Sequence, residues 1–225
     1  MSAVTQNLNV EAAPRLRITE IFYSLQGEAR TSGWPTVFIR LTGCPLRCTY
    51  CDTAYAFQGG TWMTMPEILK EVAQDHPRYV CVTGGEPLAQ RNCLPLLSAL
   101  CDAGYEVSLE TSGALDISEV DARVSRVVDV KTPSSGEVKK NRWENLPLLR
   151  AHDQVKFVIG SRADYDWAKD QVLAHALTSR CDVLFSPVHG AVTARDLADW
   201  IIVDRLPVRM QVQLHKVLWG DERGR

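Results

Sequence analysis

Short apolar runs alternate with amphipathic segments along most of the chain. Apolar runs predict strands over residues 17–25, 36–43, 79–83, 105–111, 126–131, 154–160, 182–187 and 208–215. Helical spacing predicts one helix that ends near residue 74 and three more over residues 92–102, 162–176 and 193–203. Thr64, Pro66 and Glu67 form a capping-box pattern that opens the first helix. The repeated strand–helix–strand order predicts an α/β fold with a parallel sheet.

The length of the chain limits how far such a sheet can close. Residues 1–15 are polar and predict a flexible N-terminal tail, which leaves residues 16–225 as a single domain. A complete eight-stranded barrel typically takes about 250 residues. We therefore expect a partial, TIM-like barrel of parallel strands.

Composition and charge exclude several classes of protein. The chain is 45% hydrophobic and 23% charged, with a net charge of −2, which gives no basic field for nucleic acid. Its apolar runs are too short to span a bilayer. The N-terminal segment lacks the pattern of a secretory leader, so we expect a cytoplasmic protein whose thiols stay reduced.

Polar, glycine or proline clusters follow the predicted strands at six places. The clusters read CPLRC, GGEP, TSG, KTP, SPVHG and HK. In parallel α/β folds, ligands bind at the carboxyl ends of the strands, which all lie on one face. The sequence therefore predicts an enzyme with its site on that face.

Three cysteines, Cys44, Cys48 and Cys51, have the spacing C-x3-C-x2-C. A structural zinc ion needs four ligands, and a distant histidine (His76, His189 or His215) is the candidate for the fourth. The alternative is a 4Fe-4S cluster held by three thiolates, which leaves one iron open. The residues alone leave both readings open. The other cysteines, Cys81, Cys93, Cys101 and Cys181, are predicted to be core residues.

The cysteine spacing resembles that of the radical S-adenosylmethionine (SAM) superfamily. A second match is Thr83-Gly-Gly-Glu-Pro87, which resembles the motif that binds the SAM amino group. The resemblance implies a radical SAM core, with SAM on the open iron and a 5′-deoxyadenosyl radical that takes hydrogen from the substrate. It implies that the following residues contact the cofactor: Tyr50, Asp52, Gly84, Gly85 and Glu86.

Further segments resemble the 7-carboxy-7-deazaguanine synthase family, lyases of queuosine and 7-deazapurine biosynthesis. The longest of these segments is EIFYSLQGEA, residues 20–29, in which Ala29 stands where the family usually has glycine. Thr53 matches the threonine that ligates Mg2+. The resemblance implies substrate contacts from Leu25, Gln26, Gly27, Glu28, Arg40, Thr83 and His215. It implies SAM contacts from Ser112, Lys131, Thr132, Pro133, Ser186, Pro187, Val188 and His189.

The resemblance implies conversion of 6-carboxy-5,6,7,8-tetrahydropterin to 7-carboxy-7-deazaguanine with loss of ammonia. It also implies a homodimer, a flavodoxin or ferredoxin as electron donor, and no binding of nucleic acid. One alternative is an activase of glycyl-radical enzymes, which would share the cysteines and GGEP but would not require LQGE or Thr53. The other is a non-enzymatic zinc-binding module.

Overall fold

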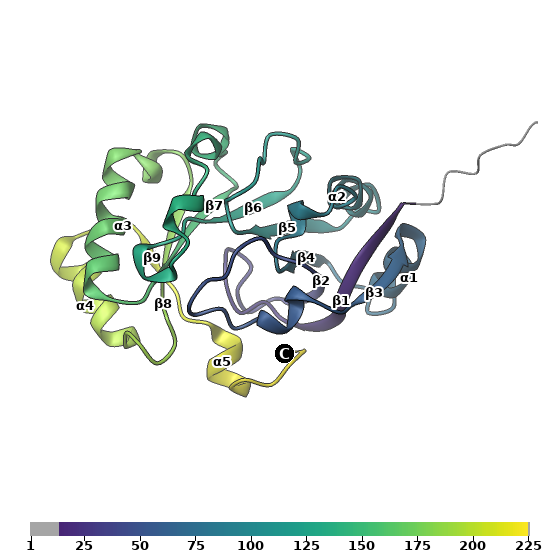
Figure 1. The fold of residues 1–225 in the computed structure, drawn as a ribbon, viewed down its shortest axis with the longest axis horizontal. Helices are drawn as coiled ribbons and strands as arrows, with labels where there is room; N and C mark the ends of the chain where they lie inside the picture. Colours follow the sequence, from purple (N-terminus) through teal and green to yellow (C-terminus); the bar gives the residue numbers. More distant parts are fainter. Residues whose placement is uncertain (1–13, 225) are drawn as a thin grey trace, which may run out of the picture.

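A single mixed sheet organises residues 14–224, the part of the chain that the computed structural model describes (Figure 1). Its nine strands lie in the order β3-β1-β2-β4-β5-β6-β7-β8-β9. They are β1 (Arg15–Leu25), β2 (Pro35–Leu41), β3 (Thr61–Thr64), β4 (Tyr79–Gly84), β5 (Glu106–Thr111), β6 (Ser125–Asp129), β7 (Gln154–Ile159), β8 (Asp182–Pro187) and β9 (Arg209–Met210). Because β3 and β9 remain unpaired edges, the sheet is open, and the predicted partial barrel is confirmed.

The direction of the first strand differs from the prediction. Strands β2 and β4 to β9 run parallel, as expected, but β1 is antiparallel to both β2 and β3. The reason is the connection: residues 26–34 form a turn that is too short for a parallel crossover. Strand β1 begins at Arg15, the last residue of the predicted tail; residues 1–13 of that tail lie outside the described residues.

Five α-helices accompany the strands within residues 14–224. They are α1 (Met65–Ala73), α2 (Cys93–Asp102), α3 (Arg162–Ala174), α4 (Ala194–Asp204) and α5 (Leu214–Trp219). The first four agree with the predicted helices to within about two residues, and Glu67 accepts the backbone N–H of Thr64 at 2.7 Å, as the capping box requires. Figure 1 shows α1 and α2 near one end of the sheet, α3 and α4 near the other, and α5 apart from them.

The last predicted strand, over residues 208–215, is mostly wrong. Only Arg209–Met210 pair with β8, and Leu214 already belongs to α5. The chain leaves the sheet because the backbone N–H of Leu214 donates to the carbonyl of Gly27 at 3.0 Å. Strand β3 was not predicted, and the segment between β6 and β7 contains three short 3-10 helices, at Pro133–Ser135, Val138–Lys140 and Trp143–Leu148.

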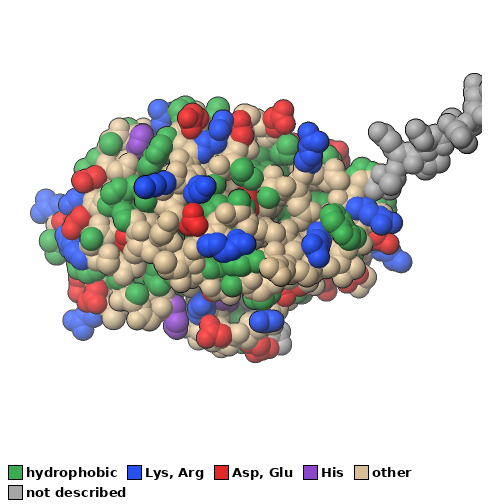
Figure 2. Space-filling model, viewed as in Figure 1, with side chains coloured by type: hydrophobic (Ala, Val, Ile, Leu, Met, Phe, Trp, Pro, Cys, Tyr) green, Lys and Arg blue, Asp and Glu red, His purple; other side chains and the backbone are tan. Residues whose placement is uncertain are grey.

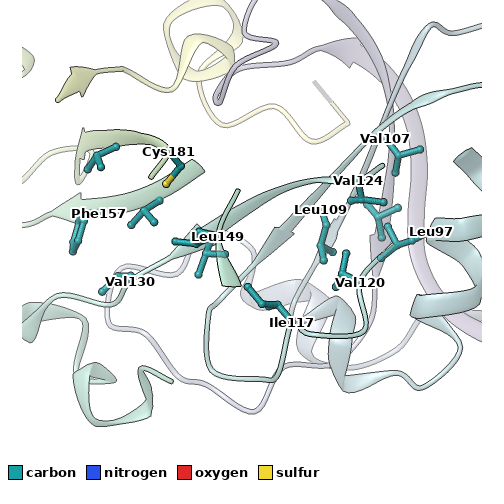
Figure 3. Close-up of a cluster of buried hydrophobic side chains, with 14 of the residues drawn as sticks. Leu97, Val107, Leu109, Ile117, Val120, Val124, Val130, Leu149, Phe157 and Cys181 are labelled. Atoms are coloured by element: carbon teal, nitrogen blue, oxygen red, sulfur yellow. The ribbon is translucent and has the colours of Figure 1, made fainter. Parts of the chain in front are cut away.

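The two faces of the parallel sheet have different roles. On β7, Val155, Phe157 and Ile159 are fully buried, whereas the alternate residues Lys156 and Val158 line a cavity. Figure 3 shows part of the core, with Leu109 of β5 beside Ile117, Val120 and Val124 and with Leu97 of α2 nearby. The aliphatic side chains therefore stabilise one face, and the opposite face is left for polar groups.

One charged pair is fully inside the core. Arg126 of β6 and Asp153 are 1% and 0% exposed, with 2.5 Å between Nη2 and Oδ2. Arg126 also donates to the carbonyl of Leu148 at 2.6 Å, and Asp153 accepts the backbone N–H of Arg150 at 2.8 Å. These bonds tie β6 to the loop before β7.

The molecular surface carries no large region of one charge on the face seen in Figure 2. Acidic and basic side chains are interspersed there, in line with the net charge of −2. None of the helices within residues 14–224 has both the length and the apolar character needed to cross a membrane.

Candidate cofactor and substrate site

A cavity of about 580 Å³ lies where the parallel strands end. The loop after β1, the cysteine loop after β2, the ends of β4 to β8 and helix α5 all contribute to its wall. Most of the predicted site residues line it: Leu25, Gln26, Gly27, Glu28, Arg40, Cys44, Cys48, Tyr50, Cys51, Asp52, Thr53, Thr83, Gly84, Gly85, Ser112, Lys131, Pro187, Val188, His189 and His215.

The three cysteines lie in one loop, between β2 and a short 3-10 helix at Ala54–Phe57. All three are partly exposed to the cavity. The loop is held by the segment after β6: Thr49 donates its backbone N–H to the carbonyl of Ser135 at 3.0 Å. Burial raises the pKa of the Cys44 and Cys48 thiols, so both keep their protons in the absence of a metal. Binding of a metal would release these protons, because the thiolate is the ligand.

The arrangement fits a cluster better than a single ion. Within residues 14–224, no three His, Cys, Asp or Glu side chains are grouped so that they could hold one metal ion. The described part of the chain thus shows no preassembled set of ligands for a single zinc ion. Three thiolates of a cluster bind three different irons, so they need not converge on one point.

The two glycines of GGEP allow β4 to approach the cysteine loop. A Cβ on Gly85 would lie 2.2 Å from the carbonyl oxygen of Gly43 and 2.8 Å from the Cβ of Cys44. A Cβ on Gly84, which has φ of +154°, would lie 2.3 Å from the carbonyl oxygen of Leu41. Both glycines line the cavity. The nearest atoms, which leave no room for a side chain at these positions, are protein backbone atoms, not a ligand.

Four of the predicted cofactor contacts do not line the cavity: Glu86, Thr132 and Ser186 are buried, and Pro133 is exposed. Glu86 is 0% exposed and accepts the backbone N–H of Ser112 at 2.7 Å and its hydroxyl at 2.5 Å. Thr132 is also fully buried and donates to the carbonyl of Val158 at 2.9 Å. In this structure the side chains of Glu86 and Thr132 position their neighbours, because their polar atoms already make these hydrogen bonds.

Helix α5 closes the cavity against the loop after β1. A Cβ on Gly27 would lie 2.3 Å from Nδ1 of His215, so any larger residue at this position would displace the His215 ring. Burial lowers the pKa of His215. Arg40 faces the same space from β2, with Nε donating to Glu20 at 2.7 Å and with its guanidinium 5.7 Å from the ring centre of Phe22.

Several charged or polar residues of the cavity wall were not among the predicted ligands; they include Glu110, Asp129, Lys156 and Gln213. Glu110 accepts from Thr83 Oγ1 at 3.0 Å and from Gln26 Nε2 at 3.3 Å. The sequence did contain a signal for Lys156: it is a lysine within the apolar run QVKFVIG. A charged residue in a buried strand requires a partner, which marks this position as unusual.

Ala29 adopts an unfavourable backbone conformation in the loop after β1. Its φ is +62°, its backbone N–H donates to Gln211 Oε1 at 3.0 Å, and its carbonyl accepts from Arg209 at 2.6 Å. Replacing a left-handed alanine with glycine relieves about 1–2 kcal/mol and loses about 0.5–1 kcal/mol in chain entropy. Ala29 is also 3% exposed, so the change removes a buried methyl group worth about 0.8 kcal/mol. We therefore expect Ala29→Gly to change the free energy of unfolding by less than about 1 kcal/mol in either direction, measured by urea titration.

The matched control for Ala29→Gly is Ala99→Gly inside α2. Glycine there should lower the free energy of unfolding by about 1 kcal/mol. Equal destabilisation by both changes would show that the backbone of Ala29 is not strained.

Comparison with known proteins agrees with this geometry. Residues 38–132 match the family described as the Radical SAM superfamily. The chain is 48% identical to the 7-carboxy-7-deazaguanine synthase of Chlorobaculum tepidum over 213 residues, covering 93% of this chain and 97% of that protein. It is 43% identical to the enzyme of that name from Koribacter versatilis over 222 residues, covering 92% of this chain and 98% of that protein.

Among solved structures, QueE from Escherichia coli is similar, with a TM-score of 0.74, 25% identity and coverage of 89% of this chain and 95% of that one. The open parallel barrel, with a three-cysteine loop and a GGEP turn at the strand ends, defines a radical SAM enzyme. The chain belongs to the 7-carboxy-7-deazaguanine synthase family. The activase and the zinc module are accordingly set aside.

Proposed function

We propose that this enzyme converts 6-carboxy-5,6,7,8-tetrahydropterin to 7-carboxy-7-deazaguanine with release of ammonia. The observation that carries the proposal is one cavity that joins the cysteine loop to the loop after β1 and to Arg40. Relatives that carry the name of this synthase cover nearly the whole chain, which supports the same reaction. The predicted cytoplasmic location, homodimer and flavodoxin or ferredoxin donor belong to this proposal.

The residues of the cavity fit the implied cofactors. Cys44, Cys48 and Cys51 would hold the 4Fe-4S cluster, and the backbone at Gly85 lies against their loop. When bound, the cluster and SAM supply the radical chemistry that removes a hydrogen atom from the substrate. Ser112, fixed by Glu86, would position SAM from the end of β5.

A charged pair near the cysteine loop suits a zwitterionic cofactor. Lys131 Nζ lies 2.7 Å from Asp129 Oδ2, and both side chains line the cavity. Burial works to lower the pKa of Lys131, but the Asp129 carboxylate outweighs it, so the pKa lies above its ordinary value. The resulting ammonium would bind the SAM carboxylate, as charge-assisted hydrogen bonds favour.

The other half of the cavity suits a pterin carboxylate. The guanidinium of Arg40 would bind the substrate carboxylate, because its planar fork matches a carboxylate. Carboxylates of the wall, such as Glu28, would accept from the N–H groups of the pterin ring. Phe22 and Phe38, stacked at 4.9 Å, add apolar surface for the ring. Thr53, close to Cys51, would supply one oxygen ligand to Mg2+ and leave the rest to substrate and water.

The test is an anaerobic assay of the reconstituted enzyme. With iron, sulfide, SAM, dithionite, Mg2+ and 6-carboxytetrahydropterin present, we expect 7-carboxy-7-deazaguanine by mass spectrometry. Cys48→Ala should abolish product and visible absorbance from the cluster, whereas Cys101→Ala, in α2 outside the cavity, should retain both. SAM cleavage with an unchanged pterin would contradict the proposed substrate.

A further inference from the structure

The cavity contains a buried ion pair that joins two distant segments. Lys156 Nζ of β7 lies 2.6 Å from Glu28 Oε2 in the loop after β1, and the side chains are 14% and 12% exposed. The second carboxylate oxygen, Oε1, accepts from Gln213 Nε2 at 2.9 Å. Both partners of the pair line the cavity, so their remaining hydrogen-bonding capacity is available to a ligand.

Packing of the sheet does not explain the ion pair between Lys156 and Glu28. Lys156 occupies the position on β7 that faces the cavity, between the fully buried Val155 and Phe157. Burying an ion pair in an apolar setting costs free energy of desolvation, and hydrophobic residues of similar size often stabilise a protein equally well. A lysine at this position is therefore better explained by what it does for the cavity.

Charged groups from several elements surround the pair of Glu28 and Lys156. His215 on α5 acts on Glu28, and Asp129 on β6 and Glu110 on β5 act on Lys156. Asp52 in the cysteine loop accepts from Gln213 at 3.3 Å and acts on His215. Burial works to raise the pKa of Glu28, but the ammonium of Lys156 outweighs it, with help from Gln213 and His215, so the pKa lies below its ordinary value. Burial works to lower the pKa of Lys156, but Glu28, Asp129 and Glu110 raise it well above its ordinary value.

We propose that Lys156 is a positioning residue for substrate binding: its ammonium holds the Glu28 carboxylate as an anion, aimed at the N–H groups of the pterin pyrimidine edge. The inference rests on the proposed function. A carboxylate offers about four acceptor sites, and Lys156 and Gln213 use one on each oxygen. Acceptor capacity therefore remains on both oxygens for ring N–H donors.

Removing the ammonium should affect binding in a way that depends on pH. Without Lys156, Glu28 would be a buried carboxylate with no adjacent cation, and burial would raise its pKa toward neutrality. Below that pKa, Glu28 would be protonated and would lose acceptor capacity toward the substrate. The binding defect should therefore be largest at low pH and should shrink as pH rises.

The experiment measures the affinity of the reconstituted enzyme for 6-carboxypterin, the oxidised analogue of the substrate, by equilibrium dialysis. For Lys156→Met we expect a Kd raised at least about 10-fold at pH 6, with a smaller increase at pH 8.5. Lys156→Arg retains the cation and should stay within about 3-fold of the unmodified enzyme at both values of pH. In turnover assays, Lys156→Met should raise KM more than it lowers kcat.

A double-variant cycle keeps the test independent of general damage to the fold. In a Glu28→Gln background, Lys156→Met should have little further effect on Kd, because the carboxylate it serves is gone. Equal losses in both backgrounds, or a defect that does not change with pH, would overturn the inference. Failure of the unmodified enzyme to turn over the pterin would instead contradict the proposed function, which is read in a separate assay.

Discussion

Gly85→Ala should lower turnover by about 100-fold or more while leaving the fold intact. The new methyl group would lie 2.2 Å from the carbonyl oxygen of Gly43 and 2.6 Å from its carbonyl carbon, which are backbone atoms with little room to move. The cysteine loop would therefore shift relative to the end of β4. A displacement of about 1 Å in a catalytic arrangement can cost about 100-fold in rate.

The measurements for Gly85→Ala are iron content after reconstitution, SAM cleavage and product formation, with circular dichroism as the check on folding. Gly104→Ala, just after α2, is the matched control, because it has φ of +92° but no atom within 4 Å of the added methyl group. It should cost stability and leave the iron content unchanged. Normal SAM cleavage by Gly85→Ala would show that the close approach of the two backbones is not needed.

Arg126→Met should be the most destabilising single change among the ion pairs described. Asp153 is 0% exposed, and the change would leave its carboxylate buried without its cation. Breaking such a pair costs about 3–5 kcal/mol. For a chain of this size, the melting temperature should fall by about 10 °C or more. Anaerobic thermal and urea unfolding of the apoprotein would measure both quantities.

The control for Arg126→Met is Arg78→Met, which removes an exposed ion pair with Glu106, whose side chains are 65% and 56% exposed. Its effect should stay within about 1 kcal/mol, because exposed pairs contribute little. The double change Arg126→Met with Asp153→Leu should recover part of the loss, since no charge would then be buried alone. A loss for Arg126→Met no larger than for Arg78→Met would refute the assignment.

Sequence patterns located the strands of the parallel sheet well because each central strand is an apolar run bounded by turn residues. The apolar pattern did not give the direction of β1, since an alternating strand has the same pattern in either direction; the short connection over residues 26–34 sets that direction. The segment 208–215 was predicted as a strand because VRMQVQLH alternates, yet its end forms α5. There the hydrogen bond from Leu214 to Gly27 outweighs local propensity, which is a weak determinant over so few residues.

The sequence by itself determined the chemistry that this protein can hold: three thiols at C-x3-C-x2-C, a glycine pair after β4 and the LQGE segment. These features are local, so the order of residues alone specifies them. Only the tertiary structure decided which side chains share one space. It placed Glu86 behind the wall, fixing Ser112, and it brought Lys156 within 2.6 Å of Glu28, 128 positions away. Such contacts depend on sheet register and on how α5 docks, and neither is encoded within a short window of sequence.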